Sequence, residues 1–337
     1  MKKAILWKKL ADDAVECSAC NFRCKISKGQ LGNCTVRRNV GGELFSLVYG
    51  EISSRNIDPV EKKPLFHFYP AMRTYSIGTV GCNFRCLFCQ NDDISQATVN
   101  ENDYFENKMS PEDVIENAKK YNCEAIAYTY NEPSIFIEFV LDTAKLAKKA
   151  GLKNVYVTNS YETKETLEEL KGLVDAMNID LKSIRDEFYM KICGAVKIDK
   201  VLETITLAKK MGFWIEITTL VIPGHNDSGG ELKQITKFIA ELDKNIPWHI
   251  SRFFPMYKME NVPETPVETL MKAYKIGKDA GLKFVYVGNL HGNEYENTVC
   301  PKCSSTIVER NWHEGIIRNK VKNGKCPECG EKIAGFF

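Results

Sequence analysis

The sequence lacks the long apolar run and the strong charge of one sign that would indicate a membrane or a nucleic acid as partner. Its 337 residues contain 46 Lys and Arg against 44 Asp and Glu, which gives a formal net charge of +2. No apolar run approaches the roughly 20 residues of a membrane-spanning helix. The basic N-terminus is not followed by the apolar core of a signal peptide. We therefore expect a cytoplasmic protein with no membrane partner and no clear nucleic-acid signal.

Cysteine is the unusual component of the chain, with thirteen residues. A chain of this length needs no disulfides for stability, and an odd count argues against a simple disulfide framework. Most of the cysteines fall into three close groups, and clustered thiols in a reducing compartment are more often metal ligands than disulfides. The groups are Cys17, Cys20, Cys24 and Cys34; Cys82, Cys86 and Cys89; and Cys300, Cys303, Cys326 and Cys329.

The three groups predict a division of the chain into a cysteine-rich segment (1–70), a core (71–290) and a short cysteine-rich module (291–337). Within the core, short apolar segments alternate with helical patterns, which predicts parallel strands joined by right-handed crossovers. The fold class is therefore α/β: a partial or full (β/α) TIM-like barrel with small cysteine-rich modules at both ends. An open doubly wound sheet is the alternative.

The ends of the predicted strands are where a ligand is expected, because ligands of both folds gather at the carboxyl ends of parallel strands. The segments predicted as strands are 74–79, 125–129, 154–158, 176–180, 214–220, 249–253 and 284–287.

The central cysteines directly follow the first of these strands, with the spacing C-x3-C-x2-C. Three thiolates hold three irons of a cubane and leave the fourth iron open to a small molecule. A structural zinc site is normally closed by a fourth ligand. The alternative is therefore a zinc site completed by His67 or by a distant cysteine.

This motif resembles the radical S-adenosylmethionine (SAM) superfamily, whose hallmark is C-x3-C-x-aromatic-C. The resemblance implies an oxygen-sensitive [4Fe–4S] cluster on Cys82, Cys86 and Cys89, with the methionine part of SAM on the open iron. One electron from the cluster then cleaves the sulfonium and yields a 5′-deoxyadenosyl radical. Phe88 is implied to lie near the adenine.

The same resemblance implies roles for residues at the later strand ends. Thr129, Asn131 and Glu132 stand where the superfamily has a Gly-Gly-Glu-like stretch that contacts the methionine amino group, although neither glycine is present here. Asn159 is implied to hold the ribose or the carboxylate. The structural alternative for Asn131 is a helix cap, and for Asn159 the end of a strand.

Two further strand ends resemble those of glycyl-radical-enzyme activases. Asp180 and Lys182 form an Asp-x-Lys stretch and, by strand alternation, point the same way. Val221 and Ile222 precede a Pro-Gly turn and are implied to pack against the adenine. The structural alternatives are a solvent-facing ion pair and ordinary core packing.

The outer cysteine groups predict two more metal sites. At the C-terminus, Cys300-Pro-Lys-Cys303 and Cys326-Pro-Glu-Cys329 are separated by 22 residues, a tetrahedral-site pattern that favours structural zinc, with rubredoxin-type iron as the alternative. At the N-terminus, the spacing C-x2-C-x3-C-x9-C suits zinc or a second iron–sulfur cluster and does not decide between them.

The order of motifs along the chain is similar to that of the AmmeMemoRadiSam-system radical enzymes, relatives of pyruvate formate-lyase activating enzyme. The resemblance implies activase-like hydrogen abstraction from a protein, peptide or small molecule, with an electron donor such as ferredoxin or flavodoxin. The alternatives are radical modification of RNA or a metabolite, and a metal-binding module without catalysis.

Overall fold

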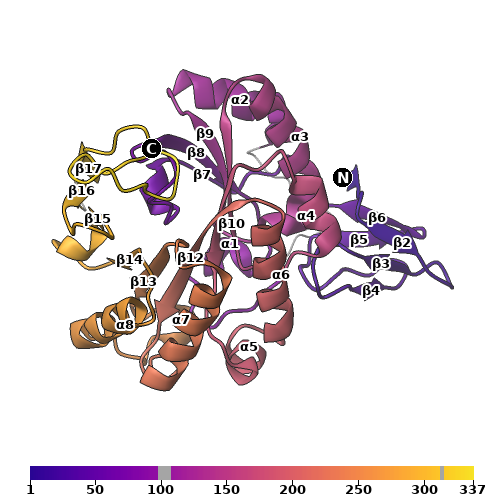
Figure 1. Ribbon diagram of the computed structural model, residues 1–337. Helices are drawn as coiled ribbons and strands as arrows, with labels where there is room; N and C mark the ends of the chain where they lie inside the picture. The colour runs from indigo at the N-terminus through magenta and orange to yellow at the C-terminus, as the bar shows by residue number, and fades with distance from the viewer. Residues whose placement is uncertain (98–107, 312–314) are drawn as a thin grey trace.

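Seven parallel strands and one antiparallel edge strand form the central sheet in a computed structural model that describes residues 1–97, 108–311 and 315–337. The sheet order is β14-β13-β12-β11-β10-β9-β8-β7 (Figure 1). Parts of the expected core and C-terminal module, residues 98–107 and 312–314, lie outside the described residues. The strands are β7 (Ser54–Pro59), β8 (Arg73–Gly78), β9 (Ala125–Tyr128), β10 (Lys153–Thr158), β11 (Ala176–Asp180), β12 (Trp214–Val221), β13 (Trp248–Arg252) and β14 (Val285–Gly288).

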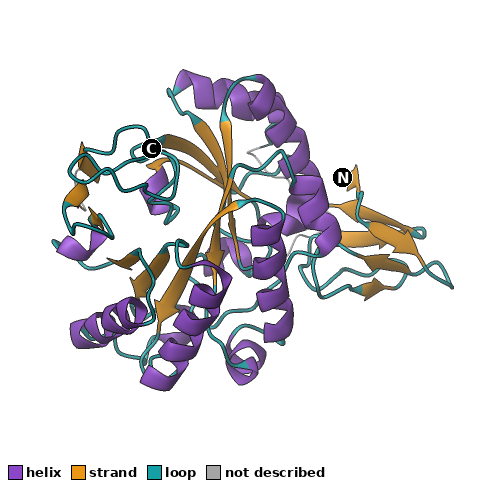
Figure 2. Cartoon of the chain, in the orientation of Figure 1, coloured by secondary structure: helices purple, strands orange, loops and turns teal. Residues whose placement is uncertain are grey.

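Helices follow the parallel strands and lie outside the sheet, as Figure 2 shows. Ser110 begins α2 with a reciprocal capping box, in which its side chain and that of Asp113 each accept a backbone N–H of the other. The helices are α1 (Asp92–Ser95), α2 (Pro111–Lys120), α3 (Ile137–Lys149), α4 (Lys164–Leu170), α5 (Asp186–Ile192), α6 (Ile198–Lys210), α7 (Gly229–Asp243) and α8 (Val267–Asp279). Short 3-10 turns are η1 (Val60–Lys62), η2 (Pro133–Phe136), η3 (Tyr257–Met259) and η4 (Glu294–Glu296).

The sheet order confirms the α/β expectation and selects the partial barrel over the doubly wound sheet. The parallel strands β8 to β14 are neighbours in chain order, whereas a doubly wound sheet reverses its order. Among the described residues, β7 and β14 are the two edges of this sheet and are not paired with each other. The barrel is therefore open on one side.

Each end of the chain is built of strands and loops. The N-terminal segment forms two antiparallel sheets, β1-β6-β5 and β2-β3-β4, and the C-terminal segment forms a third, β15-β16-β17. Figure 1 shows them on opposite sides of the central sheet. The strands are β1 (Lys2–Lys3), β2 (Trp7–Lys9), β3 (Val15–Cys17), β4 (Lys25–Ile26), β5 (Arg37–Val40), β6 (Glu43–Ser46), β15 (Thr298–Val299), β16 (Thr306–Asn311) and β17 (Gly315–Asn319).

A buried carboxylate on β12 fastens the loop between β7 and β8 inside the barrel. Glu216 accepts the backbone N–H groups of Phe66 and His67 at 2.9 and 2.8 Å, and the Nε2 of His249 lies 2.7 Å from it. The ring nitrogens of His67 pair with the Tyr286 hydroxyl at 2.5 Å and the Ala334 carbonyl at 2.6 Å. His67 is thus occupied by structural partners and does not complete a zinc site with the central cysteines.

No helix in the described parts of the chain has the length and apolar character needed to cross a membrane.

The buried His67 predicts a pH dependence of stability. Burial lowers its pKa from 6.5 to about 4. Between these values the unfolded chain binds the proton and the folded protein does not, so the free energy of unfolding falls as the pH falls. From about pH 7 to about pH 5 the loss from this residue is about 2 kcal/mol.

Urea unfolding of the metal-loaded protein under anaerobic conditions measures this effect. The variant His67→Gln is expected to lose about 2 kcal/mol less over the same pH range. The exposed His291 supplies the matched control variant, His291→Gln, which is expected to follow the wild type. An identical pH dependence in wild type and His67→Gln would contradict the assignment.

Candidate functional site

A cavity of about 370 Å³ lies at the carboxyl ends of the parallel strands. The ends of six successive strands contribute to it, and two lysines reach it from the loop after β7. Its lining includes Thr129, Thr158, Asp180, Leu220, Ser251 and Asn289 from the strand ends, with Lys62 and Lys63 from the loop.

The three central cysteines line this cavity, brought there by the loop after β8. The loop turns at Gly81, whose φ of +84° favours glycine. A Cβ at this position would meet Cγ1 of Val36 at 2.6 Å and the carbonyl oxygen of Cys34 at 2.8 Å. The cysteine loop therefore packs directly against the N-terminal segment, and a larger side chain at Gly81 would push the two apart.

The surroundings of these thiols favour the protonated form in the absence of a metal. Burial raises the pKa of Cys82 well above its usual range, and the charge of Glu132 adds to the effect. The pKa of Cys86 is also raised well above its usual range, first by a hydrogen bond with Cys193 and then by burial. Iron binds the thiolate, so loading this site releases protons.

The structure brings six of the predicted cofactor-binding residues around the same cavity. They lie at three strand ends and in the cysteine loop: Phe88, Thr129, Asn131, Asn159, Asp180 and Lys182. The other three, Glu132, Val221 and Ile222, are fully buried and are not among the residues that line it. Their predicted contact with the cofactor stays a prediction.

Glu132 holds the neighbouring strand end in place. Its carboxylate accepts the backbone N–H of Asn159 at 2.9 Å and the hydroxyl of Thr158 at 3.1 Å. Burial raises the pKa of Glu132 well above its usual range, and the adjacent carboxylate of Glu162 raises it further. A proton held near this pair reduces the repulsion between two buried acids.

Asp180 and Lys182 form an ion pair on the cavity wall. Nζ of Lys182 lies 2.6 Å from Oδ2 of Asp180 and 5.7 Å from the centre of the Phe88 ring. Burial alone would lower the pKa of Lys182, but its interactions with Asp180, Cys86 and Cys193 together outweigh burial and raise this pKa above its usual range. The lysine is therefore a fixed positive charge beside the ring predicted to contact the adenine.

Unpartnered polar atoms around the cavity match the needs of a polar ligand. Oδ1 of Asn131 and Oδ1 of Asn159 are buried without a hydrogen-bond partner, and so is Nδ2 of Asn83. Asn83 accepts a hydrogen bond from Nδ2 of Asn159 at 2.8 Å. Together with three thiols, these groups fit an iron–sulfur cluster that carries a ligand with amino and carboxylate groups.

Two of the neighbouring residues were not anticipated as part of the site. Asn83 lies inside the cysteine motif, and its position between Cys82 and Cys86 could have indicated that it belongs to the site. Cys193 follows α5, and nothing in the sequence indicated a place in the site, because this cysteine stands apart from the three groups. The structure places its backbone carbonyl 2.8 Å from the N–H of Arg85.

The C-terminal cysteines form a compact four-thiol site. The Sγ atoms of Cys300 and Cys329 are 3.6 Å apart, those of Cys303 and Cys326 are 3.7 Å apart, and all four lie within 4.8 Å of one another. A tetrahedral zinc ion with bonds of about 2.3 Å holds its sulfurs about 3.8 Å apart. The geometry fits a single tetrahedral ion, and its identity as zinc or iron stays a prediction.

A second cavity, of about 910 Å³, adjoins the first on the open side of the barrel. The β13 and β14 ends, the loop after β7 and the C-terminal module line it, the last through Arg310 and Ile316. Lys62, Thr218 and Asn289 line both cavities. The site thus has an inner part beside the cysteines and an outer part that reaches the C-terminal module.

Comparisons with known proteins give the same assignment for the core. The family model of the Radical SAM superfamily matches residues 76–239. The chain is 47% identical over 335 residues to an uncharacterized protein of Methanocaldococcus jannaschii, covering 99% of both. It is 27% identical to a putative glycyl-radical enzyme activating enzyme of that organism, covering 61% of this chain and 76% of the relative. Pyruvate formate-lyase 1-activating enzyme of Escherichia coli is 24% identical, covering 61% and 89%.

Solved structures support the fold. SuiB of Streptococcus suis bound to S-adenosylmethionine matches with a TM-score of 0.51 and 14% identity, covering 69% of this chain and 53% of that one. A radical SAM methyltransferase of Sphaerobacter thermophilus matches with a TM-score of 0.50 and 12% identity, covering 65% and 67%. Together with the cavity that the three cysteines line, the family model leads to one conclusion: this chain belongs to the radical SAM superfamily.

Proposed function

We propose that the protein reductively cleaves SAM and uses the resulting radical to remove a hydrogen atom from a protein or peptide. One observation carries the proposal: Cys82, Cys86 and Cys89 share a strand-end cavity with unpartnered polar groups and the Asp180–Lys182 pair. When bound, the cluster would supply the single electron that breaks the sulfonium bond. The chain itself would bind and orient the cluster and SAM and would shield them from water.

The residues around the cavity divide this work. Cys82, Cys86 and Cys89 would hold the cluster, and the unpartnered amide oxygens of Asn131 and Asn159 would bind the polar end of SAM. Phe88 would pack against the adenine, with Lys182 fixed beside it. Glu132 would act as a positioning residue, because it sets Thr158 and Asn159 through hydrogen bonds rather than facing the cavity.

The outer cavity favours a substrate larger than a metabolite. Its volume of about 910 Å³ adds to that of the inner cavity and opens beside the C-terminal module. Relatives named as activating enzymes support an activase-like reaction, in which the hydrogen is taken from a glycine of a protein partner. A low-potential one-electron carrier such as ferredoxin or flavodoxin would deliver the electron.

Replacing Cys86 with Ala is expected to abolish SAM cleavage, because two thiolates hold the cluster poorly. The protein is reconstituted anaerobically with iron and sulfide and reduced with dithionite, and 5′-deoxyadenosine and methionine are measured by chromatography. Cys123→Ala is the matched control, since Cys123 is equally buried but lies before β9, outside the cavity. Cleavage retained in Cys86→Ala would refute the assignment.

Replacing Lys182 with Gln is expected to weaken SAM binding about tenfold, because it removes a half-buried charge and leaves Asp180 unpaired. Equilibrium binding of SAM to the reconstituted protein measures the change. The matched control is Lys191→Gln, which removes the exposed Lys191–Glu187 pair. Equal affinity in Lys182→Gln and Lys191→Gln would show that the pair has no part in the site.

Replacing Cys303 with Ala is expected to release one metal ion and to leave the absorption spectrum of the central cluster intact. The four C-terminal thiols form their own compact site, so they bind independently of the strand-end cavity. Metal analysis and absorption spectra of wild type and variant test this. Loss of the central cluster together with the C-terminal ion would show that the two sites depend on each other.

A further inference from the structure

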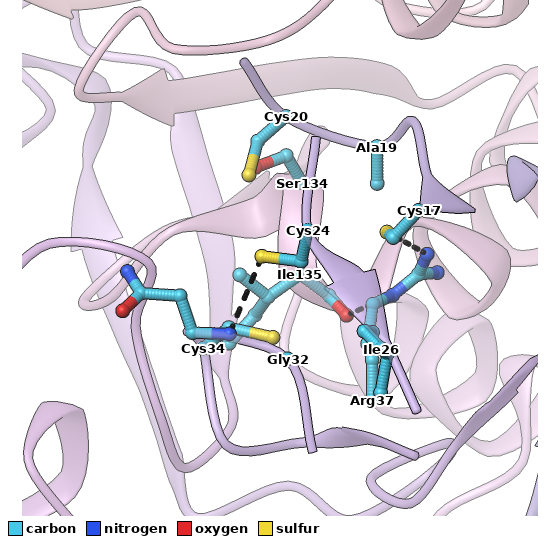
Figure 3. Close-up of a pocket in the computed structure, with 11 residues that line it drawn as sticks. Cys17, Ala19, Cys20, Cys24, Ile26, Gly32, Cys34, Arg37, Ser134 and Ile135 are labelled. Atoms are coloured by element: carbon cyan, nitrogen blue, oxygen red, sulfur yellow. Dashed lines mark hydrogen bonds between the residues drawn. The ribbon is translucent and has the colours of Figure 1, made fainter. Parts of the chain in front are cut away.

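The four N-terminal cysteines gather around a small cavity between the N-terminal segment and the core. They come from the end of β3, from the turn between β3 and β4 and from the loop between β4 and β5. Figure 3 shows their Sγ atoms on separate segments around this space, with Ser134 and Ile135 of η2 closing it from the core side. Cys17, Cys20 and Cys34 are buried, and Cys24 is half-buried.

The spread of these sulfurs differs from that at the C-terminal site. Within the described residues, the Sγ atoms of the four C-terminal cysteines all lie within 4.8 Å of one another. The Sγ atoms of the four N-terminal cysteines do not, and neither do those of the three central cysteines. A single tetrahedral ion needs its sulfurs about 3.8 Å apart. A cubane bonds each sulfur to a different iron, so its ligands stand further apart. The N-terminal group, like the central group, therefore lacks the close spacing of a single tetrahedral site.

Hydrogen-bond donors already face two of these sulfurs. The backbone N–H of Asn33 points at Sγ of Cys24 at 3.4 Å. Nη1 of Arg37 lies 3.5 Å from Sγ of Cys17, as Figure 3 shows. Arg37 is held by an ion pair with the buried Glu138 and donates to the carbonyl of Ile135 at 3.2 Å. Donors and charge beside the sulfurs stabilise an anionic cluster and set its potential.

The N-terminal site touches the central cysteine loop through its own ligand segment. Nδ2 of Asn33, the neighbour of Cys34, donates to the carbonyl of Asn83 at 2.8 Å. Nη2 of Arg85 donates to the carbonyl of Asn33 at 2.6 Å. The absence of a side chain at Gly81 lets the carbonyl of Cys34 approach the same loop. The two cysteine segments are therefore joined directly, by hydrogen bonds from side chains to backbone carbonyls and by close packing at Gly81.

We propose that Cys17, Cys20, Cys24 and Cys34 hold a second [4Fe–4S] cluster that passes electrons to the central one. An external low-potential one-electron carrier reduces the N-terminal cluster from the 2+ to the 1+ state. That cluster returns to 2+ as the central cluster goes from 2+ to 1+, with no bond broken and no proton moved. The presence of the second cluster is independent of the proposed function, whereas its relay role rests on it.

The full chain with Cys82, Cys86 and Cys89 all replaced by Ala isolates the N-terminal site. After anaerobic reconstitution it is expected to retain about four sulfide per chain, with about four iron beyond any ion at the C-terminal site, and to give the paramagnetic signal of a reduced cluster with dithionite. The wild type is expected to hold about eight sulfide, with about eight iron beyond any C-terminal ion, which tests the site even if the variant folds poorly. Zinc in place of iron and sulfide at the N-terminal site, in either protein, would overturn the proposal.

Electron counting tests the relay. Wild-type protein is fully reduced, freed of excess reductant and mixed with SAM, and 5′-deoxyadenosine is measured per chain. About two equivalents are expected, against about one for Cys20→Ala/Cys34→Ala. About one equivalent from wild type with both clusters reduced would refute the relay. No 5′-deoxyadenosine from either protein would instead refute SAM cleavage. The presence of the second cluster would still be decided by the iron content, the sulfide content and the paramagnetic signal.

Discussion

Parallel strands in one sheet end on the same edge, and the site depends on that constraint. The chain returns through a helix after each strand, so residues far apart in sequence, such as Thr129, Asp180 and Asn289, meet around one cavity. The cysteine loop follows the first of these parallel strands and covers the same edge. The strand order therefore decides where the cofactor chemistry can occur, and the loops decide which chemistry it is.

The open side of the barrel creates a second requirement, which the loop between β7 and β8 meets. Glu216 forms hydrogen bonds with that loop and with His249 of β13. The buried His67 connects the loop to β14 and to the C-terminal tail through hydrogen bonds with Tyr286 and Ala334. Arg310 of the C-terminal module donates to the carbonyl of Phe66 at 2.8 Å, so the module is fastened to this same loop. The sheet edges are thus bridged by side chains rather than by strand pairing, which leaves room for the outer cavity.

The sequence predicted the parts of this structure that have a strong local pattern. The apolar strands are an example: 176–180 was predicted with the observed bounds, and the others differ by one residue at one or both ends. The edge strand β7 was missed because Ser54–Pro59 is mostly polar and ends in proline, as edge strands often do. The division into three segments stays a prediction.

At the site, the cysteine motif predicted its own residues, because spacing and position after a strand both point to a cluster. Residues that act through contacts formed only in the fold could not be found in this way. Cys193 meets Cys86 only because α5 packs beneath the cysteine loop, and the contact of Asn33 with Asn83 depends on how the N-terminal segment docks. The sequence placed Glu132 at the right strand end. The direction of its side chain depends on hydrogen bonds with Thr158 and Asn159, which form only in the fold.

Magnetic resonance of the reduced central cluster with isotope-labelled SAM tests the central claim most directly. The protein is reconstituted anaerobically, reduced, and frozen with SAM carrying ¹⁵N in its amino group. A resolved coupling between the electron spin of the cluster and this nitrogen is expected, because three cysteines leave one iron to bind it. A fully loaded and reduced central cluster that shows no such coupling would rule out SAM binding at that iron.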